Sequence, residues 1–133
     1  MLPDWPPGTV VILATEDGAP HAIPVSAAIR AADDRILLAL AVRRGSLARL
    51  RVRPRVAVAL LAPGIAITAE GDARVVAEPL TDGTVGVEVT VEVVRDHDRP
   101  TFAIQSGVGW RWTDEQAARR DTETREALRR LAG

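Results

Sequence analysis

The stretch that decides the fold is Val85-Gly86-Val87-Glu88-Val89-Thr90-Val91-Glu92-Val93. Valine occupies every second position, and glycine, glutamate or threonine stands between. Successive side chains of a β-strand point to opposite faces of a sheet, so this period of two predicts a strand with one buried and one wet face. A chain built mainly from β-strands is therefore expected.

Two more strands are predicted just before this stretch. Residues 55–61 are predicted as a strand that begins after Pro54, is apolar from Val56 onward and is closed by Pro63-Gly64. Residues 65–79 are long enough for a bent strand, in which Gly71 can form a bulge or allow a close backbone approach.

The N-terminal part of the chain has the pattern of a meander. The apolar run 10–15 is followed by Asp17-Gly18, the signal of a tight hairpin, so the first two strands are expected to pair antiparallel. The second strand is predicted over about residues 21–30. A turn at 31–34 then leads into a third apolar strand over residues 35–42.

A short helix is predicted over residues 43–53. Leu47 and Leu50 lie three residues apart on one helical face, arginines stand on both flanks, and Pro54 ends the segment.

The C-terminal part is expected to hold one strand and one helix. A last strand is predicted over residues 102–112, with Trp110 and Trp112 on the same side. Thr113-Asp114-Glu115-Gln116 is interpreted as a capping box with Thr113 at the cap and Gln116 three residues later, so a helix begins there. Its modest apolar face predicts packing on the rim of a barrel or on a partner subunit.

These elements predict one mainly β domain over residues 1–133. Six or seven short strands with two helices favour a closed or partly closed antiparallel barrel, because closure removes exposed strand edges. A chain of 133 residues has room for a single domain.

The composition excludes several kinds of site. The chain has no cysteine, which excludes disulfides, thiolate metal sites and cysteine nucleophiles. All 17 basic residues are arginine, so there is no lysine for a Schiff base or a general base. Any anion must therefore be held by guanidinium groups or by backbone N–H groups.

Charge and hydropathy favour a cytoplasmic protein without nucleic-acid or membrane partners. The net charge of −1 gives no global field to hold nucleic acid, and no run approaches the roughly 18 apolar residues of a membrane helix. The N-terminus has no basic region of a secretory signal.

Three segments of this sequence, in this order, resemble the pyridoxamine 5'-phosphate oxidase-like split-barrel family that binds FMN or F420. They are Gly18–Val25, Ser46–Val56 and Glu70–Val76, and together they span about residues 9–79. The resemblance implies a six- to seven-stranded antiparallel split barrel with a short helix after the third strand and a helix at the C-terminus. It also implies a homodimer with two cofactor sites at the interface.

The resemblance also implies which residues hold the cofactor. In such proteins the second and third strands line the isoalloxazine or deazaflavin ring, and the following helix contacts the phosphate. The residues carried over are Ile23, Pro24, Val25 and Ser26 at the ring, Arg43, Arg44, Ser46 and Arg49 at the phosphate, and Trp110 reaching the partner's cofactor.

Two of these positions depart from the family's pattern. Many deazaflavin-binding relatives carry lysine and asparagine where this chain has Ser46 and Arg49. This favours FMN over F420, although a serine hydroxyl and a guanidinium can still bind phosphate. A helix start with free N–H groups beside guanidiniums is an anion site on physical grounds as well.

The function implied is a flavin- or deazaflavin-dependent oxidoreductase acting on a small organic substrate, with FMN as the cofactor and F420 as the alternative. Because the cofactor carries the chemistry, no catalytic side chain needs to be assigned. The other reading is a cofactor-free split barrel with a ligand-sensing or structural role.

Other patterns have simpler interpretations. The six arginines between residues 43 and 55 lack interleaved aromatic residues, so they favour a phosphate site or a solvated face over nucleic-acid binding. His21 and His97 each lack a second histidine nearby, so a metal site is not expected. Packing at a dimer interface is the simpler role for Trp110 and Trp112.

Overall fold

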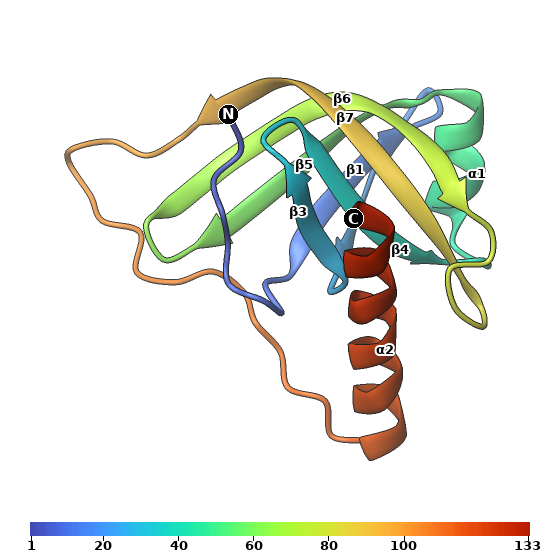
Figure 1. The fold of residues 1–133 in the computed structure, drawn as a ribbon. Helices are drawn as coiled ribbons and strands as arrows, with labels where there is room; N and C mark the ends of the chain where they lie inside the picture. The colour runs from blue at the N-terminus through green and yellow to red at the C-terminus, as the bar shows by residue number, and fades with distance from the viewer.

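The structure is a computed structural model and describes residues 1–133. It contains seven strands and two helices (Figure 1). In chain order they are β1 (Val11–Glu16), β2 (Pro20–Val25), β3 (Ala28–Ala32), β4 (Arg35–Ala41), α1 (Gly45–Val52), β5 (Arg55–Ala62), β6 (Ile65–Ala77), β7 (Thr84–Asp96) and α2 (Glu115–Ala132).

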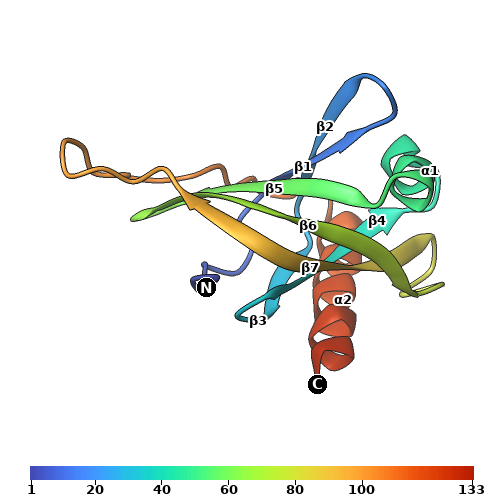
Figure 2. The same ribbon diagram turned by 90° about the horizontal axis from the view of Figure 1, so that it is seen from above.

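The seven strands form one curved antiparallel sheet in the order β2-β1-β5-β6-β7-β4-β3. Strands β2 and β3 are its two edges, so the barrel is split and the sheet is not closed, which confirms the predicted fold class. Seen from above, the β1–β2 hairpin projects from one side while α2 lies beneath the sheet (Figure 2). The predicted hairpin is confirmed, with Val11 opposite Val25 and Glu16 opposite Pro20.

The main core lies inside the curve of the sheet. It joins buried apolar side chains of all strands to Leu47 and Leu50 of α1, so the helix face predicted from their spacing is confirmed. A second, smaller core lies on the other face, where Leu128 of α2 packs against Ala27 and Leu37. Neither helix is long and apolar enough to cross a membrane.

A bulge at Gly71 bends the sheet. The register between β6 and β7 shifts between Glu70 and Gly71, and a Cβ on Gly71 would lie 1.9 Å from the Thr90 carbonyl oxygen. Only glycine fits such a close backbone approach. The predicted bulge is therefore confirmed.

The bulge also corrects the prediction of strict alternation over residues 85–93. Beyond the register shift the faces exchange, so Val93 is exposed while Val94 packs against the core. Before it, Glu88 lies on the outer face but is only 7 % exposed, because Arg35 and Arg74 cover it. The outer face is therefore less wet than the pattern predicted.

The single second strand predicted over residues 21–30 is wrong. The segment is divided at Ser26 and Ala27 into β2 and β3, which pair with β1 and with β4. These partners lie near opposite edges of the sheet, so the chain must leave one edge and cross to the other. The break puts Ser26 at the open side of the barrel.

The strand predicted over residues 102–112 is also wrong. Residues 98–113 contain no strand and form an extended segment, the strap, that leads from the end of β7 to the start of α2 (Figure 1). The Val10 N–H donates to the Val108 carbonyl, and the Gly64 N–H to the Ile104 carbonyl. Two isolated hydrogen bonds fix the path of the strap but do not make a ladder.

The cap of α2 is Asp114 and not Thr113. The Asp114 carboxylate accepts a hydrogen bond from the Ala117 N–H at 2.8 Å, which satisfies one of the free donors of the first turn. The helix is therefore predicted correctly but starts one residue later. It packs against β3 and β4, at the rim as expected.

Candidate functional site

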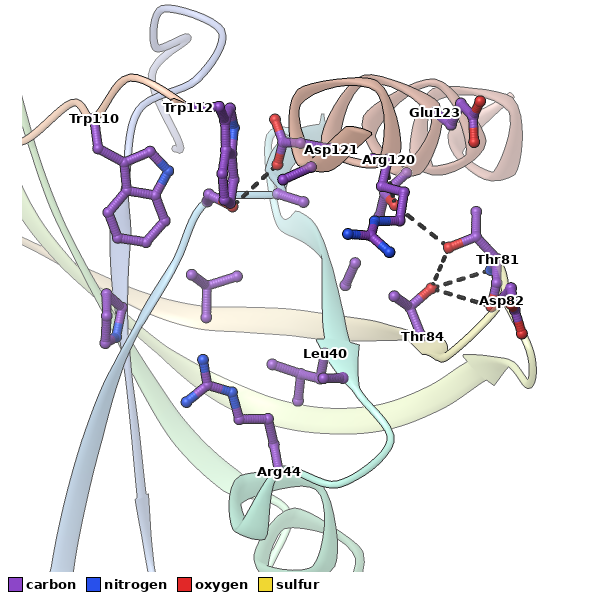
Figure 3. A pocket seen from close by; sticks show the side chains of 18 of the residues that line it. Leu40, Arg44, Thr81, Asp82, Thr84, Trp110, Trp112, Arg120, Asp121 and Glu123 are labelled. Carbon is purple, nitrogen blue, oxygen red and sulfur yellow. Dashed lines mark hydrogen bonds between the residues drawn. The ribbon is translucent and has the colours of Figure 1, made fainter. Parts of the chain in front are cut away.

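An open hollow of about 910 Å³ lies on the open side of the split barrel (Figure 3). Five segments line this hollow: the end of β2 with the following linker, the end of β4, the start of α1, the β6–β7 loop, and the end of the strap with the first turns of α2. Its volume falls at the upper end of the roughly 300–1,000 Å³ of small-molecule sites.

Most of the predicted cofactor residues lie together at this hollow. Seven of them line it, namely Ile23, Pro24, Val25, Ser26, Arg43, Arg44 and Trp110.

Ser46 and Arg49 lie outside the hollow. Ser46 is on the buried face of α1 beside Leu47 and is only 1 % exposed. Arg49 points to β1, where its Nε donates to Thr15 Oγ1 at 3.0 Å. Arg43 and Arg44 precede α1, and the first turns of the helix direct Ser46 and Arg49 to other surfaces, so the four residues cannot all face one ligand.

One wall of the hollow is apolar. Ile23 and Val25 come from β2, and Ala39, Leu40 and Ala41 from β4. Val25 and Leu40 belong to the main core, so the packing of the barrel fixes this wall. A rigid apolar wall of this kind suits a flat aromatic ring.

Four arginines line the hollow, and none of them forms an ion pair with an acidic side chain. They are Arg43 and Arg44 before α1, Arg111 on the strap and Arg120 on α2. Figure 3 shows the guanidinium groups of Arg44 and Arg120 directed into the space. No side chain caps the first turn of α1, and that turn holds no acidic residue. The hollow therefore offers several cationic donors to an anion.

The other arginines of α1 are occupied elsewhere. Arg51 contacts Glu78 and Arg53 contacts Glu16, each at 2.6 Å. The hydrogen bond from Arg53, helped by the Gly18 N–H, lowers the pKa of Glu16 below its usual value. Of the arginines in and beside α1, only Arg43 and Arg44 therefore face the hollow.

The histidines have the simple roles expected of them. His21 is bonded to Asp17 at 3.0 Å in the β1–β2 hairpin, and this hydrogen bond lowers the pKa of the Asp17 carboxyl. His97 is bonded to Thr68 at 2.9 Å. No group of histidine, aspartate and glutamate side chains could hold a metal ion.

The helix α2 supplies a wall that the sequence analysis missed. Ala117, Arg120, Asp121 and Thr124 follow the spacing of one helical face and all line the hollow. This spacing could have identified the face but not its partner. Asp121 accepts hydrogen bonds from Ser26 Oγ at 3.1 Å and from Arg125 Nε at 2.9 Å.

Two tryptophans close the hollow on the strap side. The rings of Trp110 and Trp112 are 5.8 Å apart at an interplanar angle of 70°, an edge-to-face pair. They remain 46 % and 40 % exposed. They lie near each other, although the strand predicted to place them on one side is absent.

The fold and the hollow define an open split barrel with a ligand-sized site at its open side, and solved structures share this fold. A "Putative Pyridoxamine 5'-phosphate oxidase" from Listeria innocua superposes with a TM-score of 0.58 at 15% identity, covering 68% of this chain and 90% of that one. An F420 reductase gives a TM-score of 0.58 at 14% identity and covers 66% of this chain and 90% of its own.

A third structure, BorF, is the flavin reductase component of a bacterial two-component tryptophan halogenase. It has a TM-score of 0.58 and 14% identity, and the match covers 69% of this chain and 81% of that one. No family model matches the sequence, and no curated protein matches it. The fold is thus the split barrel seen in pyridoxamine 5'-phosphate oxidase-like proteins, as the resemblance implied.

Proposed function

We propose that this protein binds a flavin-type cofactor in the hollow, FMN or alternatively F420, and acts as an oxidoreductase on a small organic substrate. The observation that carries the proposal is the pairing of an apolar wall with four arginines that have no acidic partner. Solved structures with this fold include a flavin reductase and an F420 reductase, which supports the same kind of ligand.

The residues present fit such a cofactor. Arg43 and Arg44 would hold the phosphate, and residues 23–26 would contact the ring. When bound, the cofactor supplies hydride or two-electron transfer, so the protein's own residues have to bind, orient and shield it from water. The fit does not require Ser46 or Arg49, which face elsewhere.

The proposal includes a homodimer. The strap exposes Phe102, Val108 and Trp110 to between 46 % and 60 %. Apolar residues gathered on one segment favour contact with another chain, and aromatic residues are enriched at such contacts. A second copy over the strap would cover the mouth of the hollow on the tryptophan side.

The test is a titration of the purified protein with FMN, and separately with F420, followed by fluorescence quenching. Wild-type protein is expected to bind one of them saturably. The Arg43→Ala, Arg44→Ala double variant is expected to weaken that binding by at least about 100-fold, because each charge-assisted hydrogen bond contributes roughly 1.5–3 kcal/mol.

The matched control is the Arg51→Ala, Arg53→Ala variant. It removes the same charge from the other end of α1, outside the hollow, so its affinity should equal that of the wild type. Equal losses in both variants would mean that charge alone matters and not the hollow. Absence of binding to either cofactor would favour the cofactor-free barrel.

A further inference from the structure

The hydroxyl group of Ser26 is held by a contact between distant parts of the chain. Ser26 lies in the break between β2 and β3 and lines the hollow. Its Oγ is 3.1 Å from Asp121 Oδ1 on α2, 95 residues further along the chain. Figure 3 shows Asp121 directed from α2 towards this contact.

The direction of this hydrogen bond is fixed by chemistry. A carboxylate that is paired with a guanidinium can only accept hydrogen bonds, whereas a serine hydroxyl has one hydrogen to donate. Arg125 Nε lies 2.9 Å from the other Asp121 oxygen, and the Asp121 side chain is only 10% exposed. Ser26 therefore gives its hydrogen to Asp121 and keeps only lone pairs for a ligand.

Three other hydroxyls at the hollow contact one another and not a carboxylate. Thr81 and Thr84 lie 2.6 Å apart, and either oxygen can be the donor. Thr124 gives its hydrogen to the Arg120 carbonyl and contacts Thr81 at 3.3 Å. Within this cluster only Thr81 and Thr84 can exchange donor and acceptor roles, because Thr124 has given its hydrogen to the backbone. The Ser26 hydroxyl is held as an acceptor by an ion pair.

We propose that Ser26 accepts a hydrogen bond from the imide N–H of the bound ring, and that Asp121 is a positioning residue that enforces this polarity. The inference rests on the proposed function and deepens it, because it states which edge of the ring faces α2. The imide N–H is present in both the oxidised and the reduced ring, so this contact would orient the cofactor throughout a reaction cycle. An acceptor hydroxyl beside an apolar wall suits a ligand with a ring N–H donor.

The test compares FMN with 3-methyl-FMN, which differs only in carrying a methyl group in place of the imide hydrogen. Wild-type protein is expected to prefer FMN by about threefold to tenfold, the contribution of one neutral hydrogen bond. In Ser26→Ala the preference should disappear because FMN binds more weakly. If it disappeared because 3-methyl-FMN bound more tightly, the preference would be steric and the proposal would be overturned.

Two further variants separate polarity from packing. Asp121→Asn places an amide beside Ser26 that can donate to it, which frees the hydroxyl to donate into the hollow, so the FMN preference should fall although Ser26 is intact. Ser26→Thr keeps the hydroxyl and should retain the preference. Arg119→Gln, an exposed neighbour on α2 without an ion pair, is the control and should match the wild type.

The outcomes distinguish this inference from the proposed function. FMN binding that depends on Arg43 and Arg44 but shows no preference over 3-methyl-FMN would overturn the role of Ser26 and leave the cofactor site in place. A preference unchanged in Ser26→Ala or Asp121→Asn would do the same. If neither FMN nor F420 binds, both proposals fail together.

Discussion

The arginines of the outer sheet and those of the hollow differ in what they contact. On the outer face, Arg35 and Arg74 hold Glu88, and Arg55 contacts Asp72 and Glu92. The arginines at the hollow have no acidic partner. A cation neutralised within the chain contributes to the fold, whereas a cation left free beside an apolar wall can bind a ligand.

The largest loss of stability is expected where the strap lies against Leu61 of β5. This contact positions the strap, which carries Arg111, one of the arginines of the hollow. A Cβ on Gly107 would lie 1.6 Å from the Leu61 carbonyl oxygen, so Gly107→Ala must displace the strap. Backbone overlap of this kind costs about 2 kcal/mol or more. We expect a lower Tm and loss of the near-ultraviolet circular dichroism of the tryptophan pair.

A control for this variant lies two residues away. A Cβ on Gly109 would meet nothing within 4 Å, so Gly109→Ala should behave like the wild type. If both glycine variants lost the tryptophan signal equally, flexibility of the strap and not its contact with Leu61 would be responsible.

The next largest loss of stability is expected from breaking the ion pairs of Arg35 and Arg74 with Glu88. Glu88→Gln replaces a carboxylate that serves two guanidiniums with an amide that has one acceptor oxygen. We expect a loss of about 1–3 kcal/mol in the free energy of unfolding, measured by urea denaturation. Glu92→Gln on the same strand, where the side chain is 57% exposed, should cost less than about 1 kcal/mol.

The contacts of Glu88 with Arg35 and Arg74 also predict that the stability of the fold depends on pH. Burial acts to raise the pKa of Glu88, but the hydrogen bonds from Arg35 and Arg74 together outweigh it and hold the pKa below its ordinary value of 4.5. A group with a lowered pKa stabilises the fold above its unfolded pKa and loses that contribution as the pH falls through the folded one. Below pH 4.5 the stability advantage of the wild type over Glu88→Gln should therefore shrink. An advantage that stayed constant in acid would contradict this assignment.

The smallest effect on stability is expected from replacing Arg43 and Arg44, the arginines before α1 that have no acidic partner. Arg43→Ala, Arg44→Ala removes no ion pair, so the free energy of unfolding should change by less than about 0.5 kcal/mol while cofactor binding weakens by at least about 100-fold. Thermal melts with and without FMN measure both quantities. A large destabilisation without ligand would show that Arg43 and Arg44 stabilise the fold. The distinction between the arginines of the outer sheet and those of the hollow would then be wrong.

Local patterns predicted the parts of the molecule that local physics controls. The Asp17-Gly18 hairpin, the α1 face of Leu47 and Leu50 and the bulge at Gly71 each follow from a few neighbouring residues. The apolar wall and the arginines before α1 lie on these elements, so most of the predicted site residues meet at the hollow.

The features that local patterns did not predict depend on contacts between residues far apart in the sequence. The break at Ser26 exists because β2 and β3 pair at opposite edges of the sheet, which no property of residues 21–30 reveals. The strap follows a path set by single hydrogen bonds to residues far away in sequence. Arg49 and Ser46 face away from the hollow because the first turn of α1 rotates them onto other surfaces.

The contact between Ser26 and Asp121 has a consequence for proteolysis. Trypsin cleaves after lysine and arginine, and in this lysine-free chain α2 carries five arginines. The helix is held to the sheet by a core of only a few side chains, so its release would expose these arginines to the protease. A ligand seated between β2 and α2 would tie the two together and protect those sites. Occupancy of the hollow should therefore be readable as the lifetime of the C-terminal helix under trypsin.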